Sequence, residues 1–204
     1  MGEPQKTLYL VAGPNGAGKS TFTQQKNIEA PVVDPDAIAR KINPGDPQQA
    51  SVAAGRQAVK EIREHIKAGR SFAREMTLSG NSGLKLINQV KKAGYRVELH
   101  YIGVNHWMLS RKRVNERVQQ GGHDIPTEDL KRRFKRSLDN LKGIIKKIDA
   151  GKLYDNTGFG RRIVADIDKG QVYATTGNNL PHWISDAGVR VLSQNENQDR
   201  DFEY

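Results

Sequence analysis

Residues 13–20 read Gly13-Pro14-Asn15-Gly16-Ala17-Gly18-Lys19-Ser20, and this stretch decides the fold. It matches the phosphate-binding pattern G-x-x-x-x-G-K-[ST], whose glycines let the backbone curl so that successive N–H groups point into one concavity. A helix that follows such a loop adds the positive end of its dipole. We expect Lys19 to bridge the outer phosphates of a nucleotide and Ser20 to ligate magnesium. The predicted nucleotide-binding residues are Gly13, Pro14, Asn15, Gly16, Ala17, Gly18, Lys19, Ser20 and Thr21.

The segments on either side of the loop support this interpretation over that of an ordinary glycine turn. Residues 7–12 form a short apolar run that predicts a buried strand, and residues 19–25 begin a helix. Strand and helix patterns alternate along the rest of the chain, which predicts an α/β fold with helices on both faces of the sheet. Further strands are predicted at 31–33, 71–75, 96–104, 162–165 and 171–175, and further helices start near 34, 52, 84, 106 and 126.

Bulk properties restrict the class of protein. The 204 residues contain no cysteine, which excludes disulfides, cysteine-ligated zinc and a cysteine nucleophile. No apolar stretch approaches 18 residues, so we expect no membrane span and a cytoplasmic location. The formal charge of +10 suits an anionic partner without choosing among nucleotide, nucleic acid, anionic substrate and acidic protein, and a solvated basic surface is the simpler alternative.

The residues that follow the predicted strands help to separate the possible classes of reaction. Motors and switches with this loop usually carry an acidic residue at the end of an apolar strand, but the strand at 97–104 ends in Asn105-His106. This favours a kinase that acts on a small molecule. Asp34 and Asp36 follow the second strand, where a carboxylate could take the proton of an acceptor hydroxyl or orient magnesium. It could instead cap the next helix. One of them can act while the other caps.

Glu75 is a second acidic candidate, at the end of the third predicted strand. It is followed by small polar residues that include Thr77, and such a group can bind acceptor hydroxyls. The alternative is that Glu75 lies at the end of a strand on the surface and binds no acceptor.

Arginines concentrate on two predicted helices. Arg113 and Arg117 are spaced i, i+4 and share a helical face, and the helices are joined by residues 120–126 with Gly121-Gly122. Guanidinium groups can stabilise a transferring phosphate, so residues 106–136 are predicted to form a lid over the nucleotide, with a solvated basic face as the alternative. The other arginines of this region are Arg111, Arg132, Arg133 and Arg136.

Several of these motifs, taken in order, resemble the zeta toxin kinases, in particular their short bacterial members. The motifs are Gly-Pro-Asn-Gly-Ala-Gly-Lys-Ser (13–20), Asp-Pro-Asp-Ala-Ile-Ala-Arg (34–40), Glu-x-Thr-Leu-Ser-Gly (75–80), Gly-Tyr-x-Val (94–97), Gly-Gly-His-Asp-Ile-Pro (121–126) and Tyr-Asp-Asn-Thr (154–157). The resemblance implies a P-loop kinase fold: a three-layer sandwich with a mostly parallel sheet and an arginine-rich helical lid. It implies one domain over residues 1–193, and the polar residues 194–204 are expected to form a flexible tail.

The resemblance also implies an activity and its residues. Magnesium and ATP or GTP would serve to phosphorylate a sugar hydroxyl of UDP-N-acetylglucosamine, and an antitoxin protein would hold this toxin in check. By position, Lys19, Asp36, Arg113 and Arg117 are catalytic, Ser20 binds the metal, and Glu75 and Thr77 face the acceptor. Asp34 is the second choice for the catalytic carboxylate, and Arg133 is a further arginine candidate.

Two alternatives remain open at this point. The first is a P-loop kinase acting on another metabolite or on a nucleic-acid end, which the positive charge motivates, although aromatic residues make up only 6% of the chain and are not interleaved in its basic stretch. The second is a nucleotide-responsive module that binds an acidic partner with little turnover. The combination of Lys19, Ser20, Asp36 and Glu75 argues against this second alternative.

Overall fold

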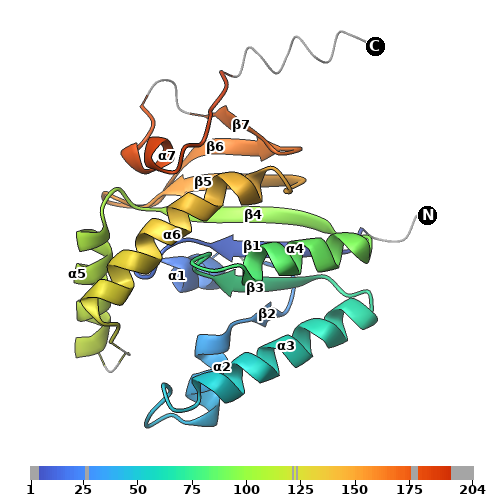
Figure 1. Ribbon diagram of the computed structural model, residues 1–204, viewed down its shortest axis with the longest axis vertical. Coiled ribbons are helices and arrows are strands. Elements are labelled where there is room, and N and C mark those ends of the chain that lie inside the picture. The colour runs from blue at the N-terminus through green and yellow to red at the C-terminus, as the bar shows by residue number, and fades with distance from the viewer. Residues whose placement is uncertain (1–4, 26–27, 121, 123, 176–178, 194–204) are drawn as a thin grey trace.

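The computed structural model describes residues 5–25, 28–120, 122, 124–175 and 179–193. Its centre is a seven-stranded sheet with the order β2-β3-β1-β4-β5-β6-β7 (Figure 1). The strands are β1 (Thr7–Ala12), β2 (Val32–Val33), β3 (Phe72–Met76), β4 (Arg96–Gly103), β5 (Ala150–Asp155), β6 (Arg162–Asp168) and β7 (Gln171–Ala174). The helices are α1 (Lys19–Gln25), α2 (Pro35–Ile42), α3 (Ser51–Lys67), α4 (Ser82–Lys92), α5 (Trp107–Gln119), α6 (Thr127–Ile145) and α7 (His182–Asp186).

The direction of each strand follows from its connections. Strands β2, β3, β1, β4 and β5 run parallel, and each crossover between them contains helix, as parallel neighbours require. The short connections after β5 and β6 make β6 and β7 antiparallel. The prediction of a mostly parallel sheet is therefore confirmed, and the carboxyl ends of β1, β3 and β4 meet at one edge.

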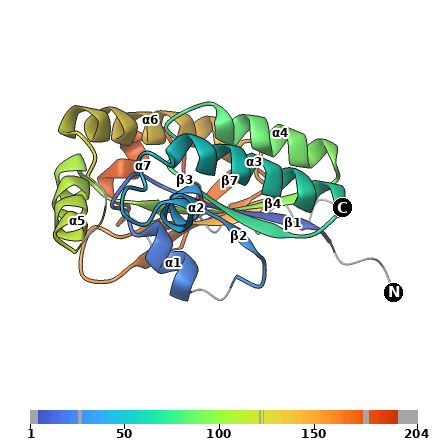
Figure 2. The same cartoon turned by 90° about the horizontal axis from the view of Figure 1, so that it is seen from below.

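Helices cover both faces of the sheet, but unequally. Figure 2 shows α3, α4 and α6 on one face and α1 on the other. Alternate residues of β4 point to opposite faces of the sheet. The Tyr101 hydroxyl contacts Ser137 of α6, whereas the centroid of the His100 ring lies 5.1 Å from that of the Phe22 ring of α1. The arrangement is the three-layer α/β sandwich that the sequence predicts.

Helix α6 forms the apolar stripe expected from its sequence. Its buried residues include Leu130, Phe134, Leu138 and Leu141, at three- and four-residue steps. Phe134 and those after it pack into the main core, whereas Leu130 belongs to a separate small cluster with residues of α5 and the α5–α6 connection. The α5–α6 hairpin therefore has a small apolar cluster of its own, and Trp107 packs against both this cluster and the main core.

Strand β5 and helix α7 were not predicted from the sequence. The start of β5, Ala150-Gly151-Lys152, lacks an apolar pattern, and Gly151 is required because a Cβ there would lie 2.3 Å from the Leu99 carbonyl oxygen of β4. Helix α7 is only five residues long, and its Trp183 ring packs directly on the backbone of Gly103. Both elements are stabilised by packing against residues far away in the sequence, which local sequence patterns do not indicate.

Two predicted features lie outside the described residues: most of the Gly121-Gly122-His123 turn of the lid, and the tail at 194–204. Within the part of the chain that is described, none of the helices combines the length and the apolar character that a membrane span needs.

Candidate active site

The phosphate-binding loop connects β1 to α1 and is closely packed from two sides. Gly13 has φ +146°, and a Cβ there would lie 2.2 Å from the Ile102 carbonyl oxygen of β4. Gly16 has φ +72°, and a Cβ there would lie 2.6 Å from the Ser110 carbonyl oxygen of α5. Only glycine fits this conformation and spacing at both positions. The first part of α5 therefore rests directly on the loop.

Lys19 folds back over this loop. Its Nζ donates hydrogen bonds of 2.9 Å to the carbonyl oxygens of Gly13 and Pro14. Burial lowers the pKa of Lys19 to about 8, although the negative charges of Glu75 and Asp36 act in the opposite direction. The ammonium group therefore lies where it could exchange two carbonyl partners for phosphate oxygens.

Glu75 lies against the first turns of α1. In the parallel register its neighbour on β1 is Val11, just before the loop. The carboxylate accepts hydrogen bonds from Ser20 Oγ at 3.1 Å and from Thr23 Oγ1 at 2.5 Å. Burial raises the pKa of Glu75, and the two hydroxyl donors partly offset that rise. The side chain predicted to face an acceptor thus contacts the predicted metal ligand.

Asp34 and Asp36 divide their roles at the start of α2. Asp34 is the N-cap residue, and its Oδ1 accepts a 2.9 Å hydrogen bond from the Asp36 backbone N–H. The Asp36 side chain is exposed, and its charge acts on both Lys19 and Arg74. Arg74 Nη1 donates to the Val33 carbonyl oxygen at 3.0 Å, which joins β3 to the end of β2, just before the Asp34 cap of α2. Asp36 is therefore the exposed carboxylate of the pair.

Arg113 points from α5 toward the loop through Asn156. Its Nη2 donates a 2.8 Å hydrogen bond to the Asn156 carbonyl oxygen, and Asn156 Nδ2 donates a 2.8 Å hydrogen bond to the Ala17 carbonyl oxygen. Arg113 Nη1 is buried without a hydrogen-bond partner in the described structure. An unsatisfied buried donor of a cation is costly, so this atom is suited to an anionic ligand.

The other arginines of the predicted lid differ in their surroundings. Arg117 lies within electrostatic range of Lys19 and lowers its pKa. Arg111 instead pairs with Asp124 at 2.9 Å and donates to the Ile125 carbonyl oxygen, so it fastens the α5–α6 connection. Arg132 pairs with Asp129 within α6, Arg133 is half-buried and Arg136 is exposed.

Thr77 follows β3 beyond Glu75 on the same edge of the sheet. Its Oγ1 shares a 2.9 Å hydrogen bond with Ser79 Oγ, and neither hydroxyl reaches Glu75 in the described contacts. The predicted pair of substrate-binding residues is thus split: Glu75 faces α1, and Thr77 lies in the loop before α4.

A pocket of about 380 Å³ adjoins the phosphate loop on its other side. Its edge is formed by Arg161, whose Nη2 donates to Gln25 Oε1 at 3.2 Å and whose guanidinium lies 4.7 Å from the Phe22 ring centroid. The lining residues are Gly18, Thr21, Gln25, Asn156, Gly160 and Arg161.

Comparison with known proteins shows the family and the fold of the chain. Residues 2–159 match the family model described as zeta toxin. This chain belongs to the zeta toxin family. An uncharacterized protein of Haemophilus influenzae is 37% identical over 131 residues, which make up 64% of this chain and 94% of the relative.

Solved structures similar to this zeta toxin chain show the same fold. A chain of the AvrRxo1-ORF1:-ORF2 complex with ATP matches 85% of it with a TM-score of 0.67 and 18% identity. A chain from the PezAT toxin–antitoxin system of Streptococcus pneumoniae matches 81% of it with a TM-score of 0.61 and 19% identity. This chain spans 61% of the former and 72% of the latter.

Four side chains at the site were not singled out from the sequence: Thr23, Arg74, Asn156 and Arg161. Asn156 lies within the Tyr-Asp-Asn-Thr motif (154–157), which was part of the family resemblance, so that motif could have indicated it. Thr23 is one helical turn after Lys19, which is a weaker indication. No local pattern marks Arg74 or Arg161.

Proposed function

We propose that this chain is an ATP- or GTP-dependent kinase that phosphorylates a hydroxyl of a nucleotide-activated sugar such as UDP-N-acetylglucosamine. The observation that carries the proposal is the grouping of Lys19, Ser20 and Glu75, with the exposed carboxylate of Asp36 within electrostatic range. Membership of the zeta toxin family supports the kinase class. The choice of acceptor depends on the family resemblance.

The donor nucleotide would bind through the loop. The loop N–H groups and Lys19 would hold its outer phosphates, and the pocket edged by Gln25 and Arg161 would take its base. The buried Nη1 of Arg113 would donate to a phosphate oxygen, because it has no other described partner. Arg117 would add positive charge to the same region, and the α5–α6 hairpin would serve as the lid.

Magnesium fits the side chains at the start of α1. The Ser20 hydroxyl is an oxygen donor next to a carboxylate, and Mg²⁺ prefers oxygen ligands from one or two protein groups together with phosphates. When bound, the ion would neutralise charge on the transferring phosphate. Glu75 would hold the Ser20 hydroxyl in a fixed orientation for this role.

Asp36 would act on the acceptor. Its carboxylate is exposed at the start of α2, so an acceptor hydroxyl could approach and lose its proton to it during transfer. Asp34, which is committed to capping α2, is less suited to this task. Thr77 would contact the acceptor from the loop after β3.

The proposed context is that of a toxin restrained by an antitoxin protein in the cytoplasm. The PezAT structure is described as a toxin–antitoxin system, and this supports an antitoxin for the present chain. Phosphorylation of a nucleotide-activated sugar would withdraw it from cell-wall synthesis.

The acceptor can be identified by inducing the wild-type chain in bacterial cells and comparing their metabolites by mass spectrometry. We expect a nucleotide sugar that carries one additional phosphate. Lys19→Ala should abolish the product, whereas Lys67→Ala, at an exposed position on α3, should leave it unchanged. An unchanged nucleotide-sugar pool with the wild type would contradict the proposed acceptor.

A nucleic-acid end is the second candidate acceptor, and the net charge of +10 is the observation that favours it. Neutralisation of phosphates by lysine and arginine would make binding fall steeply with salt concentration. If labelled RNA and DNA show no salt-dependent shift in a gel, this alternative is removed.

A further inference from the structure

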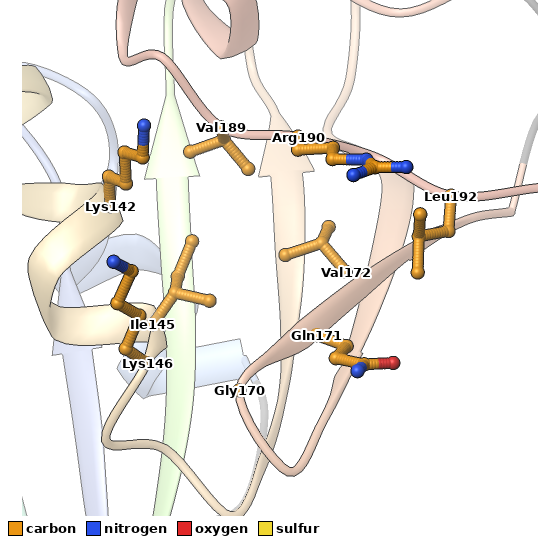
Figure 3. Close-up of a pocket in the computed structure, with 9 residues that line it drawn as sticks. All are labelled: Lys142, Ile145, Lys146, Gly170, Gln171, Val172, Val189, Arg190 and Leu192. Atoms are coloured by element: carbon orange, nitrogen blue, oxygen red, sulfur yellow. The ribbon is translucent and has the colours of Figure 1, made fainter.

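A second pocket lies toward the opposite end of the sheet from the phosphate loop. It is enclosed by the C-terminal part of α6, the turn between β6 and β7, and the segment Val189–Leu192 (Figure 3). Helix α6 ends just before β5 begins, so this pocket lies toward the amino ends of the parallel strands. The phosphate loop, in contrast, follows the carboxyl end of β1.

The pocket combines an apolar floor with a basic rim. Its volume is about 290 Å³, near the lower limit of about 300 Å³ for small-molecule sites, which suits one or two side chains better than a cofactor. Figure 3 shows Ile145, Val172 and Val189 between two lysines, Lys142 and Lys146, and Arg190. The remaining lining residues are Gly170, Gln171 and Leu192.

The basic side chains of this rim have no acidic counterpart among the described residues. Neither Lys142, Lys146 nor Arg190 forms an ion pair there. Lys142 and Lys146 are spaced i, i+4, an arrangement in which like charges repel. The dipole at the end of α6 favours the two lysines, but it does not account for Arg190, which comes from another segment. An acidic occupant would relieve the repulsion among all three.

We propose that residues 199–204 of the same chain bind in this pocket. These residues lie outside the described part of the chain and read Asp-Arg-Asp-Phe-Glu-Tyr, with three acidic and two aromatic side chains. Phe202 or Tyr204 would enter the apolar floor, and the carboxylates of the segment would face the basic rim. The composition of the segment thus complements both parts of the pocket.

The length of the connection permits this contact. Leu192 lines the pocket, and residues 193–198 separate it from the proposed occupant. Six residues span up to about 20 Å at about 3.3 Å each, which is enough for the chain to turn back. Because the occupant is tethered, its effective concentration is in the millimolar range, so a weak contact suffices. The bound segment would cover apolar surface beside β7, which is an edge strand of the sheet.

The absence of native cysteines allows a direct test, because an introduced pair has no competing thiol. One cysteine replaces Arg200, which leaves every acidic and aromatic side chain of the segment intact. The other cysteine replaces Lys146, which lines the pocket. In the matched control it replaces the neighbouring Lys147, which is exposed and does not line the pocket. Disulfide formation under mild oxidation is followed by non-reducing electrophoresis of the full-length chain.

We expect the Lys146→Cys/Arg200→Cys chain to form an intramolecular disulfide at least tenfold faster than the Lys147→Cys/Arg200→Cys control. Adding Phe202→Ser and Tyr204→Ser should remove this difference, and so should Arg190→Glu. Equal rates for the two pairs would overturn the proposal. A disulfide that links two chains would also overturn it, because the occupant would then be the segment of a second copy.

A second measurement uses the native sequence without cysteines. Hydrogen exchange of the backbone amides in Val189–Leu192 should be several-fold slower in the wild type than in the Phe202→Ser/Tyr204→Ser chain. Identical exchange in the two chains would contradict the proposal. Neither experiment measures phosphoryl transfer, so both outcomes are independent of the proposed kinase activity.

Discussion

Ser20 Oγ donates a 3.1 Å hydrogen bond to Glu75 Oε2, which joins the helix after the phosphate loop to the end of the neighbouring strand β3. The sequence has no carboxylate for a metal at the end of the strand at 97–104, which is followed by Asn105-His106. The structure places a carboxylate beside the predicted metal ligand, but at the end of β3. Glu75 is therefore better suited to orienting the metal ligand than to binding the acceptor alone.

Replacing Glu75 with Gln tests this role, because the side chain keeps its shape and loses its charge. We expect kcat to fall about 10²-fold and the Mg²⁺ concentration for half-maximal activity to rise. Urea unfolding should show equal or higher stability, because a buried carboxylate is removed. Thr23→Val serves as the control that removes the other hydrogen bond of Glu75. An unchanged magnesium dependence in Glu75→Gln would contradict the assignment.

Asp36 and Asp34 can be separated by paired substitutions. Asp36→Asn should lower kcat by about 10²- to 10⁴-fold, the usual contribution of a general base, and leave ATP binding intact. Asp34→Ala should lower the free energy of unfolding by about 1 kcal/mol, because α2 loses its N-cap. Steady-state kinetics and urea denaturation distinguish the two effects. If Asp34→Asn abolishes transfer while Asp36→Asn retains it, the roles are reversed.

Arg113 should contribute to phosphate binding rather than to base binding. Because its buried Nη1 lacks a described partner, we expect Arg113→Met to weaken ATP binding about tenfold or more, within the usual range for charge-assisted hydrogen bonds. Adenosine binding should change much less. Arg132→Met, at an exposed residue paired with Asp129, is the control. Calorimetry that shows equal losses for ATP and adenosine would refute the role.

The lowered pKa of Lys19 predicts how ATP binding depends on pH. Burial brings this pKa to about 8, so the free protein carries a charged Lys19 below that pH and a neutral one above it. Phosphates favour the charged form, so binding above pH 8 must take up a proton. The affinity should therefore fall by about tenfold per pH unit above 8 until the pKa of the complex is reached.

This pH dependence can be measured by titrating a fluorescent ATP analogue between pH 7 and 9.5. Lys19→Arg keeps the positive charge throughout this range, so its binding curve should show no inflection near pH 8. A flat profile for the wild type would show that Lys19 stays charged in the free protein.

The parts of the fold that could be predicted are those with local signals. The loop at 13–20 is recognisable because its glycines, lysine and serine have fixed spacing, and α6 is recognisable because its apolar residues recur at helical intervals. Strand β5 was not predicted because Gly151 and Lys152 interrupt the apolar pattern of the segment. That segment is extended because it pairs with β4 on one side and β6 on the other.

The sequence predicts candidate residues for the site, but not the contacts between them. Glu75 was identified, yet its contact with Ser20 depends on β3 lying beside β1, and strand order is not encoded locally. Likewise, the path from Arg113 through Asn156 to Ala17 joins three segments far apart in the sequence. The assignment of Arg111 to the lid chemistry is weakened by its ion pair with Asp124, which depends on how the α5–α6 connection folds.

The most direct test of the kinase proposal is transfer of the γ-phosphate in vitro. Purified chain is incubated with Mg²⁺, γ-labelled ATP and UDP-N-acetylglucosamine, alongside Lys19→Ala and Asp36→Ala, and the products are separated by chromatography. We predict label on the nucleotide sugar with the wild type and none with either variant. A wild-type chain that binds ATP but leaves a panel of nucleotide sugars and nucleic-acid ends unlabelled would contradict the account.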